Sequence, residues 1–262
     1  MDTGLYRKFM IFVMVFFCYS IGFTGLSSAE RLLGSRDDIA LIQFRLKDRP
    51  IGERIAFWAS RFIGSPYDTD PLGEYVRREV IIADDRVDCM YMTFRSVELA
   101  LTSTPDEAVN EALKRRFFGK GLLRDGRVLN YDDRYQYGED MIDSGKWGIE
   151  ITERLGKTTD IQGSRGRGKV AIISKSHLLK DETLSKIKNG DIVFFIKSPL
   201  KRIVDEIVGH IGIIEVKKGR IYLIHASGTK GANAPPGMVK RISFIDYIKK
   251  MDFVGIKVTR FE

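Results

Sequence analysis

The sequence has few of the residues that most often carry covalent or metal chemistry. Its 262 residues include only 2 cysteines and 3 histidines. No Cys-x-x-Cys pair or His-Glu-x-x-His motif is present, so the spacing of the common zinc sites is missing. We therefore expect neither a metal nor another cofactor. An internal repeat is also absent, and no clear linker separates two domains.

The N-terminus has the order of a secretory signal peptide. Arg7 and Lys8 precede an almost wholly apolar run over residues 9–23. Ser27-Ser28-Ala29 then places small residues where a signal peptidase cleaves. The apolar run is shorter than the roughly 20 residues that cross a bilayer, which favours cleavage over an uncleaved membrane anchor.

A lipid anchor on Cys18 is also disfavoured. Cys18 lies inside the apolar run and not at its end, where the modified cysteine of a lipoprotein is expected. We therefore predict a signal peptide over residues 1–29 and a single domain over residues 30–262. The mature chain is expected in the periplasm or cell envelope, with no stable membrane span.

The mature chain is basic. After residue 29 it contains 41 basic and 34 acidic residues, a net charge of +7. An exported basic protein suits a polyanionic envelope or a wall polymer, although simple solubility would explain the charge equally well. No nucleic-acid-binding module is recognisable, so nucleic acid is not an expected partner.

Removal of the signal peptide leaves Cys89 as the only cysteine. Exported proteins meet an oxidising compartment, where cysteines usually form pairs. A lone cysteine there is an intermolecular link, a buried inert thiol or a reactive nucleophile. The sequence around Cys89 is needed to choose among these three.

Periodicity predicts helices in the first half of the chain and strands in the last third. Asp88 is expected to cap the helix that begins at Cys89, and Asp125-Gly126 to form a hairpin turn. The Gly- and Arg-rich segment 157–169 is interpreted as a flexible basic surface loop. This order predicts an α+β domain with helices packed on one face of an antiparallel sheet. The expected helices cover residues 35–48, 51–64, 89–101, 104–119 and 137–144, and the strands 170–173, 191–197, 209–216, 220–226 and 254–259.

Hairpin parity brings two histidines together. A two-residue turn at Lys218-Gly219 would place His210 and His225 on the same face of the sheet as diagonal neighbours. A helix N-terminus and a nearby imidazolium both lower a cysteine pKa, so Cys89 with these histidines fits a nucleophilic site. Two alternatives stay open, because strand histidines are usually partly buried structural residues and one Cys with two His could hold zinc. His177 is expected at the surface near a helix start.

At these residues the chain resembles the bacterial N-acetylmuramoyl-L-alanine amidase-like family, long catalogued as a domain of unknown function. That family lies among the NlpC-type papain-like cell-wall peptidases. The resemblance extends from Ile51 to Arg260. The matching pieces are Phe62-Ile63-Gly64-Ser65-Pro66-Tyr67, Val87-Asp88-Cys89, Asp125-Gly126-Arg127-Val128, Arg134-Tyr135, Asn189-Gly190-Asp191-Ile192-Val193, Gly209-His210-Ile211-Gly212-Ile213 and Leu223-Ile224-His225-Ala226-Ser227.

The resemblance implies a papain-like fold, with N-terminal helices on an antiparallel sheet or half-barrel. It implies a hydrolase that cleaves an amide bond of peptidoglycan or muropeptides through an acyl-enzyme. Cys89 would be the nucleophile, His210 the general base and acid, and His225 the residue that orients His210. Tyr67 and Asp88 would contact substrate. Thr229 to Gly237 is expected to form part of the cleft rim.

The sequence departs from this family in two places. Met90-Tyr91-Met92 replaces the Thr-Thr-Phe that commonly follows the cysteine, and the usual tryptophan is missing around Asp140-Met141. These departures affect substrate preference and leave the nucleophile intact. Cleavage between muramic acid and L-alanine and cleavage after D-glutamate both stay open. A non-catalytic wall-binding module and a papain-like acyltransferase or thioesterase are the alternative functions.

Overall fold

The computed structural model describes residues 33–262, so the predicted signal peptide and Cys18 lie outside the described residues. Helices dominate the first half and strands the second, as the sequence predicts. The helices are α2 (Arg36–Leu46), α3 (Ile51–Arg61), α4 (Glu74–Arg77), α5 (Cys89–Leu101), α6 (Pro105–Arg115), α7 (Gly138–Asp143), α8 (Thr152–Leu155), α9 (Lys175–Leu178), α10 (Asp181–Leu184) and α11 (Phe244–Lys250). Two 3-10 turns, η1 (Tyr131–Asp133) and η2 (Pro199–Lys201), complete the set.

The strands of the second half form one antiparallel sheet of 8 strands. Its order is β4-β5-β10-β6-β7-β8-β9, and β3 also pairs with β10. A separate hairpin, β1 (Leu123–Arg124) with β2 (Arg127–Val128), turns at Asp125-Gly126 as predicted. The sheet strands are β3 (Ile149–Glu150), β4 (Thr159–Gln162), β5 (Lys169–Ser174), β6 (Ile192–Ile196), β7 (Val208–Lys217), β8 (Arg220–Ser227), β9 (Met238–Ser243) and β10 (Gly255–Arg260).

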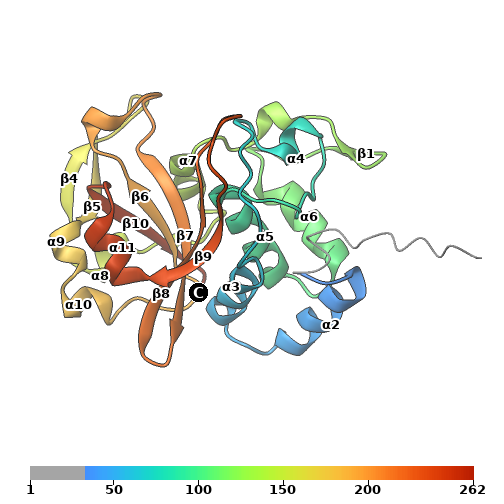
Figure 1. The fold of residues 1–262 in the computed structure, drawn as a ribbon, viewed down its shortest axis with the longest axis horizontal. Helices are drawn as coiled ribbons and strands as arrows, with labels where there is room; N and C mark the ends of the chain where they lie inside the picture. Colours follow the sequence, from blue (N-terminus) through green and yellow to red (C-terminus); the bar gives the residue numbers. More distant parts are fainter. Residues whose placement is uncertain (1–32) are drawn as a thin grey trace, which may run out of the picture.

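Helices cover both faces of the sheet. The N-terminal helices α3 and α5 pack against β7 on one face, where Ile211 and Ile213 are buried. This packing confirms the predicted α+β architecture. The other face, which carries Phe195 and Leu223, is covered by α8 to α11 and was not expected to be covered. Figure 1 shows the sheet between the α2–α6 group and the smaller helices.

Local sequence signals explain where the helices start. Ser35 forms a capping box with Asp38 at the start of α2. Thr104 accepts the N–H of Glu107 at the start of α6, with Pro105 in the first turn. These caps stabilise helix ends that would otherwise leave N–H groups without acceptors.

One prediction was wrong. Residues 157–169 do not form a flexible basic loop, because Thr159 to Gln162 is strand β4, paired with β5. Arg165 and Arg167 form ion pairs with acidic residues of α7, including Asp140. The two arginines of this segment are therefore paired with one helix and are not free surface charges.

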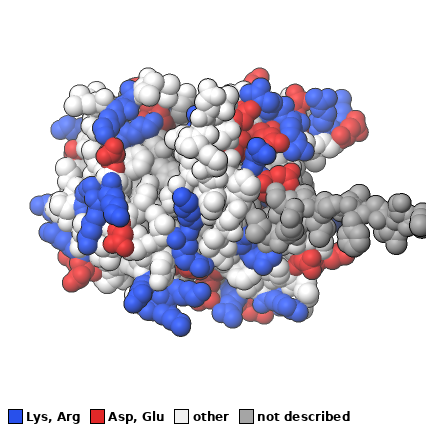
Figure 2. Space-filling view, viewed as in Figure 1, with Lys and Arg blue, Asp and Glu red and all other residues white. Residues whose placement is uncertain are grey.

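The surface mixes both charge signs. Lys and Arg side chains occur in small groups, interspersed with Asp and Glu, over the face shown in Figure 2. Within residues 33–262 every helix is too short or too polar to cross a bilayer.

Candidate active site

Cys89 begins α5, as predicted, and is half-buried. Asp88 caps the helix, because its Oδ1 accepts the N–H of Tyr91 at 2.7 Å. The preceding residue, Val87, bonds to Pro66 through its N–H. The candidate nucleophile thus lies at a helix N-terminus, and the residues just before it are held by the cap and by the bond to Pro66.

The Asp88 carboxylate has a second partner that the sequence did not reveal. Its Oδ2 lies 2.8 Å from Nζ of Lys230, in the loop between β8 and β9. Lys230 also lies over the Tyr67 ring, 5.6 Å from its centroid. The cap and this cation occupy both carboxylate oxygens, which offsets part of the charge that opposes a thiolate at Cys89.

The two histidines predicted to be neighbours are hydrogen-bonded. His210 Nε2 and His225 Nδ1 are 2.8 Å apart, and their rings meet edge to face at 5.0 Å. The hairpin register matches the prediction, because Lys217 pairs with Arg220 across a turn in which Lys218 and Gly219 have positive φ. Since Nε2 of His210 is engaged by His225, its Nδ1 is the nitrogen left for a reacting group.

A bulge precedes His210 near the start of β7. His210 pairs with Phe195 while Val208 pairs with Ile196, so Gly209 is an extra residue on β7. A Cβ at Gly209 would lie 2.5 Å from the Phe253 ring, which explains the glycine. Bulges of this kind re-aim side chains and are common beside active sites.

The resting site is electrically neutral at its centre. Burial and the Asp88 carboxylate raise the pKa of Cys89 to about 12, against the favourable effect of the Ile211 N–H and Lys230. Burial, together with His225, lowers the pKa of His210 to about 3. Burial likewise lowers the pKa of His225 to about 4. The structure therefore favours a thiol and a neutral imidazole over the thiolate–imidazolium pair before substrate binds.

Tyr247 of α11 is a member of the site that the sequence did not predict. Its ring centroid lies 5.1 Å from that of His225 and 5.0 Å from that of Phe195. Burial and the nearby Cys89 raise its pKa to about 12. No helix was expected over residues 244–250, so its phenol was not linked to the histidines.

Tyr67 joins the cysteine segment to the β8–β9 loop. Its N–H donates to the Gly237 carbonyl at 2.8 Å, and its backbone bridges to Val87. A Cβ at Gly228 or at Gly237 would strike the Tyr67 side chain, so both glycines allow the loop to pack on it. Tyr67 borders the site in this way, while Asp88 faces the cavity directly.

Cys89 and His210 line the same cavity, of about 270 Å³. Its walls also carry Arg134, Glu206 and Lys230, and Lys230 comes from the loop predicted to form the rim. His177 lies elsewhere, with its Nδ1 3.2 Å from the Ser174 hydroxyl. The structure thus brings Cys89 and His210 to one cavity, with His225 bonded behind His210.

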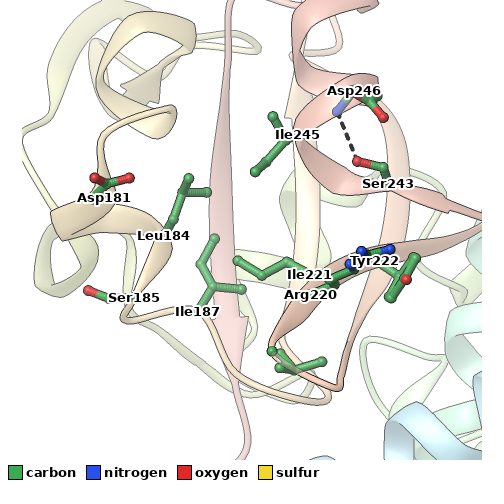
Figure 3. A pocket seen from close by; sticks show the side chains of 12 residues that line it. Asp181, Leu184, Ser185, Ile187, Arg220, Ile221, Tyr222, Ser243, Ile245 and Asp246 are labelled. Atoms are coloured by element: carbon green, nitrogen blue, oxygen red, sulfur yellow. Dashed lines mark hydrogen bonds between the residues drawn. The ribbon is translucent and has the colours of Figure 1, made fainter.

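Other hollows are larger but lack this chemistry. A groove of about 760 Å³ lies between α10, the β7–β8 hairpin and α11. Figure 3 shows Leu184, Ile187 and Ile221 lining it, with Ser243 bonded to the Asp246 N–H. No cysteine or histidine is among its lining residues.

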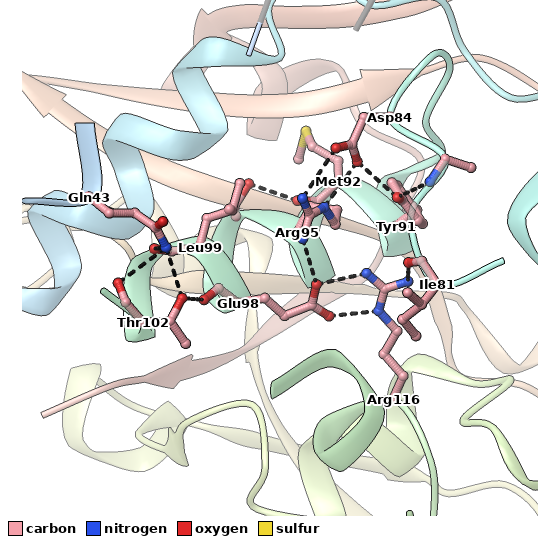
Figure 4. A network of polar contacts seen from close by, with 12 residues as sticks. Gln43, Ile81, Asp84, Tyr91, Met92, Arg95, Glu98, Leu99, Thr102 and Arg116 are labelled. Atoms are coloured by element: carbon pink, nitrogen blue, oxygen red, sulfur yellow. Dashed lines mark hydrogen bonds and ion pairs between the residues drawn. The ribbon is translucent and has the colours of Figure 1, made fainter. Parts of the chain in front are cut away.

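A buried polar network supports the nucleophile helix on the side away from the cavity. Arg116, the C-cap residue of α6, binds Glu98 of α5 through two hydrogen bonds of 2.6 and 2.7 Å, and also bonds to the Ile81 carbonyl. Arg95 pairs with Asp84, which also accepts the Tyr91 hydroxyl (Figure 4). The network ties α5 to α6 and to the loop that precedes Cys89.

The described part of the chain, residues 33–262, contains no group of three or more His, Cys, Asp or Glu side chains that could hold a metal ion. The geometry thus shows an α+β protein in which a half-buried cysteine shares a cavity with one of two bonded histidines.

Comparisons with known proteins give the fold a context. The chain resembles an N-acetylmuramoyl-L-alanine amidase from Bacteroides uniformis at 20% identity and a TM-score of 0.61, over 81% of this chain and 99% of that one. It also resembles LPG0564 from Legionella pneumophila, of family DUF1460, at 15% identity and a TM-score of 0.64, over 88% of this chain and 96% of that one. A protein from Bacteroides fragilis described as a proposed xylanase is similar at 20% identity and a TM-score of 0.57, over 79% of this chain and 100% of that one. No family model and no curated protein matches the sequence. At such identities these likenesses show a shared fold.

Proposed function

We propose that the chain is a cysteine-dependent amide hydrolase that acts on peptidoglycan or its fragments in the periplasm or cell envelope. The observation that carries this proposal is the shared cavity of Cys89 and His210, with His225 bonded to His210. The papain-like character expected from the sequence is part of the proposal. So are the extent of the single domain, residues 30–262, and export by the predicted signal peptide.

The mechanism starts from the neutral pair. Nδ1 of His210 takes the thiol proton as the Cys89 sulfur attacks an amide carbonyl. The resulting oxyanion lies at the N-terminus of α5, where helix N–H groups stabilise negative charge. Collapse of this intermediate breaks the C–N bond, and His210 returns the proton to the leaving nitrogen.

Hydrolysis of the acyl-enzyme then completes the cycle. His210 takes a proton from water, the hydroxide attacks the thioester, and Cys89 leaves as the thiol after receiving that proton. His225 holds His210 with Nε2 protonated, because only that tautomer leaves Nδ1 free to act as a base. His225 acts through His210 and has no direct role in bond breaking.

The bond we propose is the one between muramic acid and L-alanine. The named activity of the Bacteroides uniformis neighbour supports this choice over the bond after D-glutamate. Met90-Tyr91-Met92, just beyond the nucleophile, is one of the two stretches in which this chain departs from the family that it resembles.

Incubation with defined muropeptides and mass spectrometry of the products tests the proposal. The mature wild-type protein should release free peptide from the sugar, and Cys89→Ala and His210→Gln should not. His177→Gln is the matched control, because His177 lies outside the cavity, and it should keep full activity. No product from any wall fragment would overturn the hydrolase and leave a wall-binding module. Transfer of the acyl group to an amine instead of water would identify an acyltransferase.

A further inference from the structure

The cavity that holds Cys89 is lined by four acidic or basic side chains besides the cysteine and histidine. They are Asp88, Lys230, Arg134 and Glu206. Asp88 and Lys230 bind each other at 2.8 Å, so their charges offset one another. The charge that a ligand meets therefore depends on Glu206 and Arg134.

Burial weakens the negative charge of Glu206. The residue is only 5% exposed, and its Oε1 accepts the Val208 N–H at 3.1 Å. Burial raises its pKa to about 7, and the neighbouring Glu139 adds to this effect, against the Val208 N–H, Arg165 and Lys197. Near neutral pH Glu206 is therefore only partly ionised, so its carboxylate does not fully balance a cation in the cavity.

Within the described residues, no ion pair offsets the positive charge of Arg134. Its Nη1 bonds to the Tyr131 carbonyl at 2.9 Å, but within residues 33–262 no carboxylate lies at ion-pair distance and no group accepts from its Nε or Nη2. The backbone that carries it is fixed, because Tyr135 donates to the Arg116 carbonyl at 2.9 Å and Arg134 bridges to Phe117. A charged guanidinium on a rigid segment thus faces the cavity with free donors.

We propose that Arg134 binds a carboxylate of the peptide substrate and is a specificity-determining residue of the site. The proposal rests on the proposed function and adds a substrate class, peptides with a free carboxylate near the cleaved bond. A guanidinium fork matches a carboxylate through two parallel, charge-assisted hydrogen bonds. A carboxamide of the same shape offers one acceptor and no charge, so the site should discriminate between the two.

The experiment compares N-acetylmuramoyl-L-alanyl-D-glutamate with the same compound carrying two carboxamides, as substrates and as ligands of Cys89→Ala. The wild type should prefer the acid in kcat/KM by about tenfold to a hundredfold, the range of a charged hydrogen bond. Arg134→Gln should lose this preference because its kcat/KM falls for the acid and stays unchanged for the carboxamide. Arg134→Lys should keep part of it, because the charge stays and the fork is lost. Arg127→Gln, an exposed arginine paired with Glu79 outside the cavity, is the matched control.

The outcomes separate this proposal from the hydrolase itself. An Arg134→Gln variant that loses both substrates equally, or that keeps the preference, would overturn the carboxylate site while the hydrolase stands. If the wild type cleaves neither compound, calorimetry of both with Cys89→Ala decides. Tighter binding of the acid that Arg134→Gln abolishes supports the anion site without hydrolysis. Equal binding of the acid and the carboxamide, or no binding of either, would overturn the proposed carboxylate site.

Discussion

Nζ of Lys230 lies 2.8 Å from Oδ2 of Asp88 and so joins two residues 142 positions apart in the chain. The other oxygen of the same carboxylate caps α5 at the N–H of Tyr91. One acidic side chain thus organises the helix start, while a cation from the cavity rim offsets its charge beside the Cys89 sulfur. This pair makes the reactivity of the thiol dependent on the β8–β9 loop.

Lys230→Gln should make the Cys89 thiol less reactive. Loss of the cation leaves Asp88 uncompensated, which raises the thiol pKa further and lowers the thiolate fraction at a given pH. We expect alkylation by iodoacetamide at pH 8 to slow by about threefold to tenfold. Lys218→Gln, at the exposed hairpin turn, should leave the rate unchanged.

A second substitution tests the cause. Asp88→Asn keeps a cap for α5, since asparagine is also a good N-cap, but removes the charge. Added to Lys230→Gln, it should restore the alkylation rate or exceed it. A rate that stays low in the double variant would show that Lys230 acts by holding the loop and not through its charge.

The bonded histidines should make the folded protein acid-sensitive. The folded state lowers the pKa of His210 to about 3 and of His225 to about 4, from 6.5. Between those values and 6.5 the unfolded chain binds more protons, so stability falls as pH decreases through this window. Each histidine should cost about 2 kcal/mol between pH 7 and pH 5. Urea unfolding at both pH values gives the fall in the free energy of unfolding from pH 7 to pH 5. This fall should be smaller for His225→Gln than for the wild type and unchanged for His177→Gln.

The two histidines should differ in their effect on turnover. His210→Gln removes the proton acceptor, and we expect kcat to fall by about 10²- to 10⁴-fold. His225→Gln leaves that acceptor but no longer fixes its tautomer as firmly, so the loss should be smaller. Equal losses would show that His225 takes a direct part in proton transfer.

Local signals made much of this site predictable. The cap at Asp88 and the turn at Lys218-Gly219 depend on a few neighbouring residues, and both match the structure. Once the turn length is known, strand parity determines which face His210 and His225 share. Sequence alone was sufficient for these features because each has a short-range physical cause.

Long-range pairings were not predictable in the same way. Lys230 is separated from Asp88, and Tyr247 from His210, by loops whose paths the sequence does not reveal. The error over residues 157–169 has the same origin. Arg165 and Arg167 look like free basic residues in a sequence window, yet their acidic partners lie on α7, about 25 positions earlier.

The Glu98–Arg116 pair behind α5 should be a major contributor to stability. Both side chains are nearly inaccessible, with exposures of 0% and 1%. Arg116→Met would leave the Glu98 carboxylate buried with only the longer 3.5 Å contact to Arg95. Removing one partner of a buried ion pair typically costs about 3–5 kcal/mol. Urea denaturation of the variant should show a loss in this range.

The double variant Arg116→Met with Glu98→Leu separates the cost of an unpaired charge from the value of the pair. Two apolar side chains of similar volume need no compensation, so the double variant should be more stable than Arg116→Met alone. Arg115→Met, at the last residue of α6 and partly exposed, controls for loss of an arginine. If the double variant loses as much stability as the sum of the two single variants, the hydrogen bonds of these side chains, including that of Arg116 to the Ile81 carbonyl, set the loss, and charge burial does not.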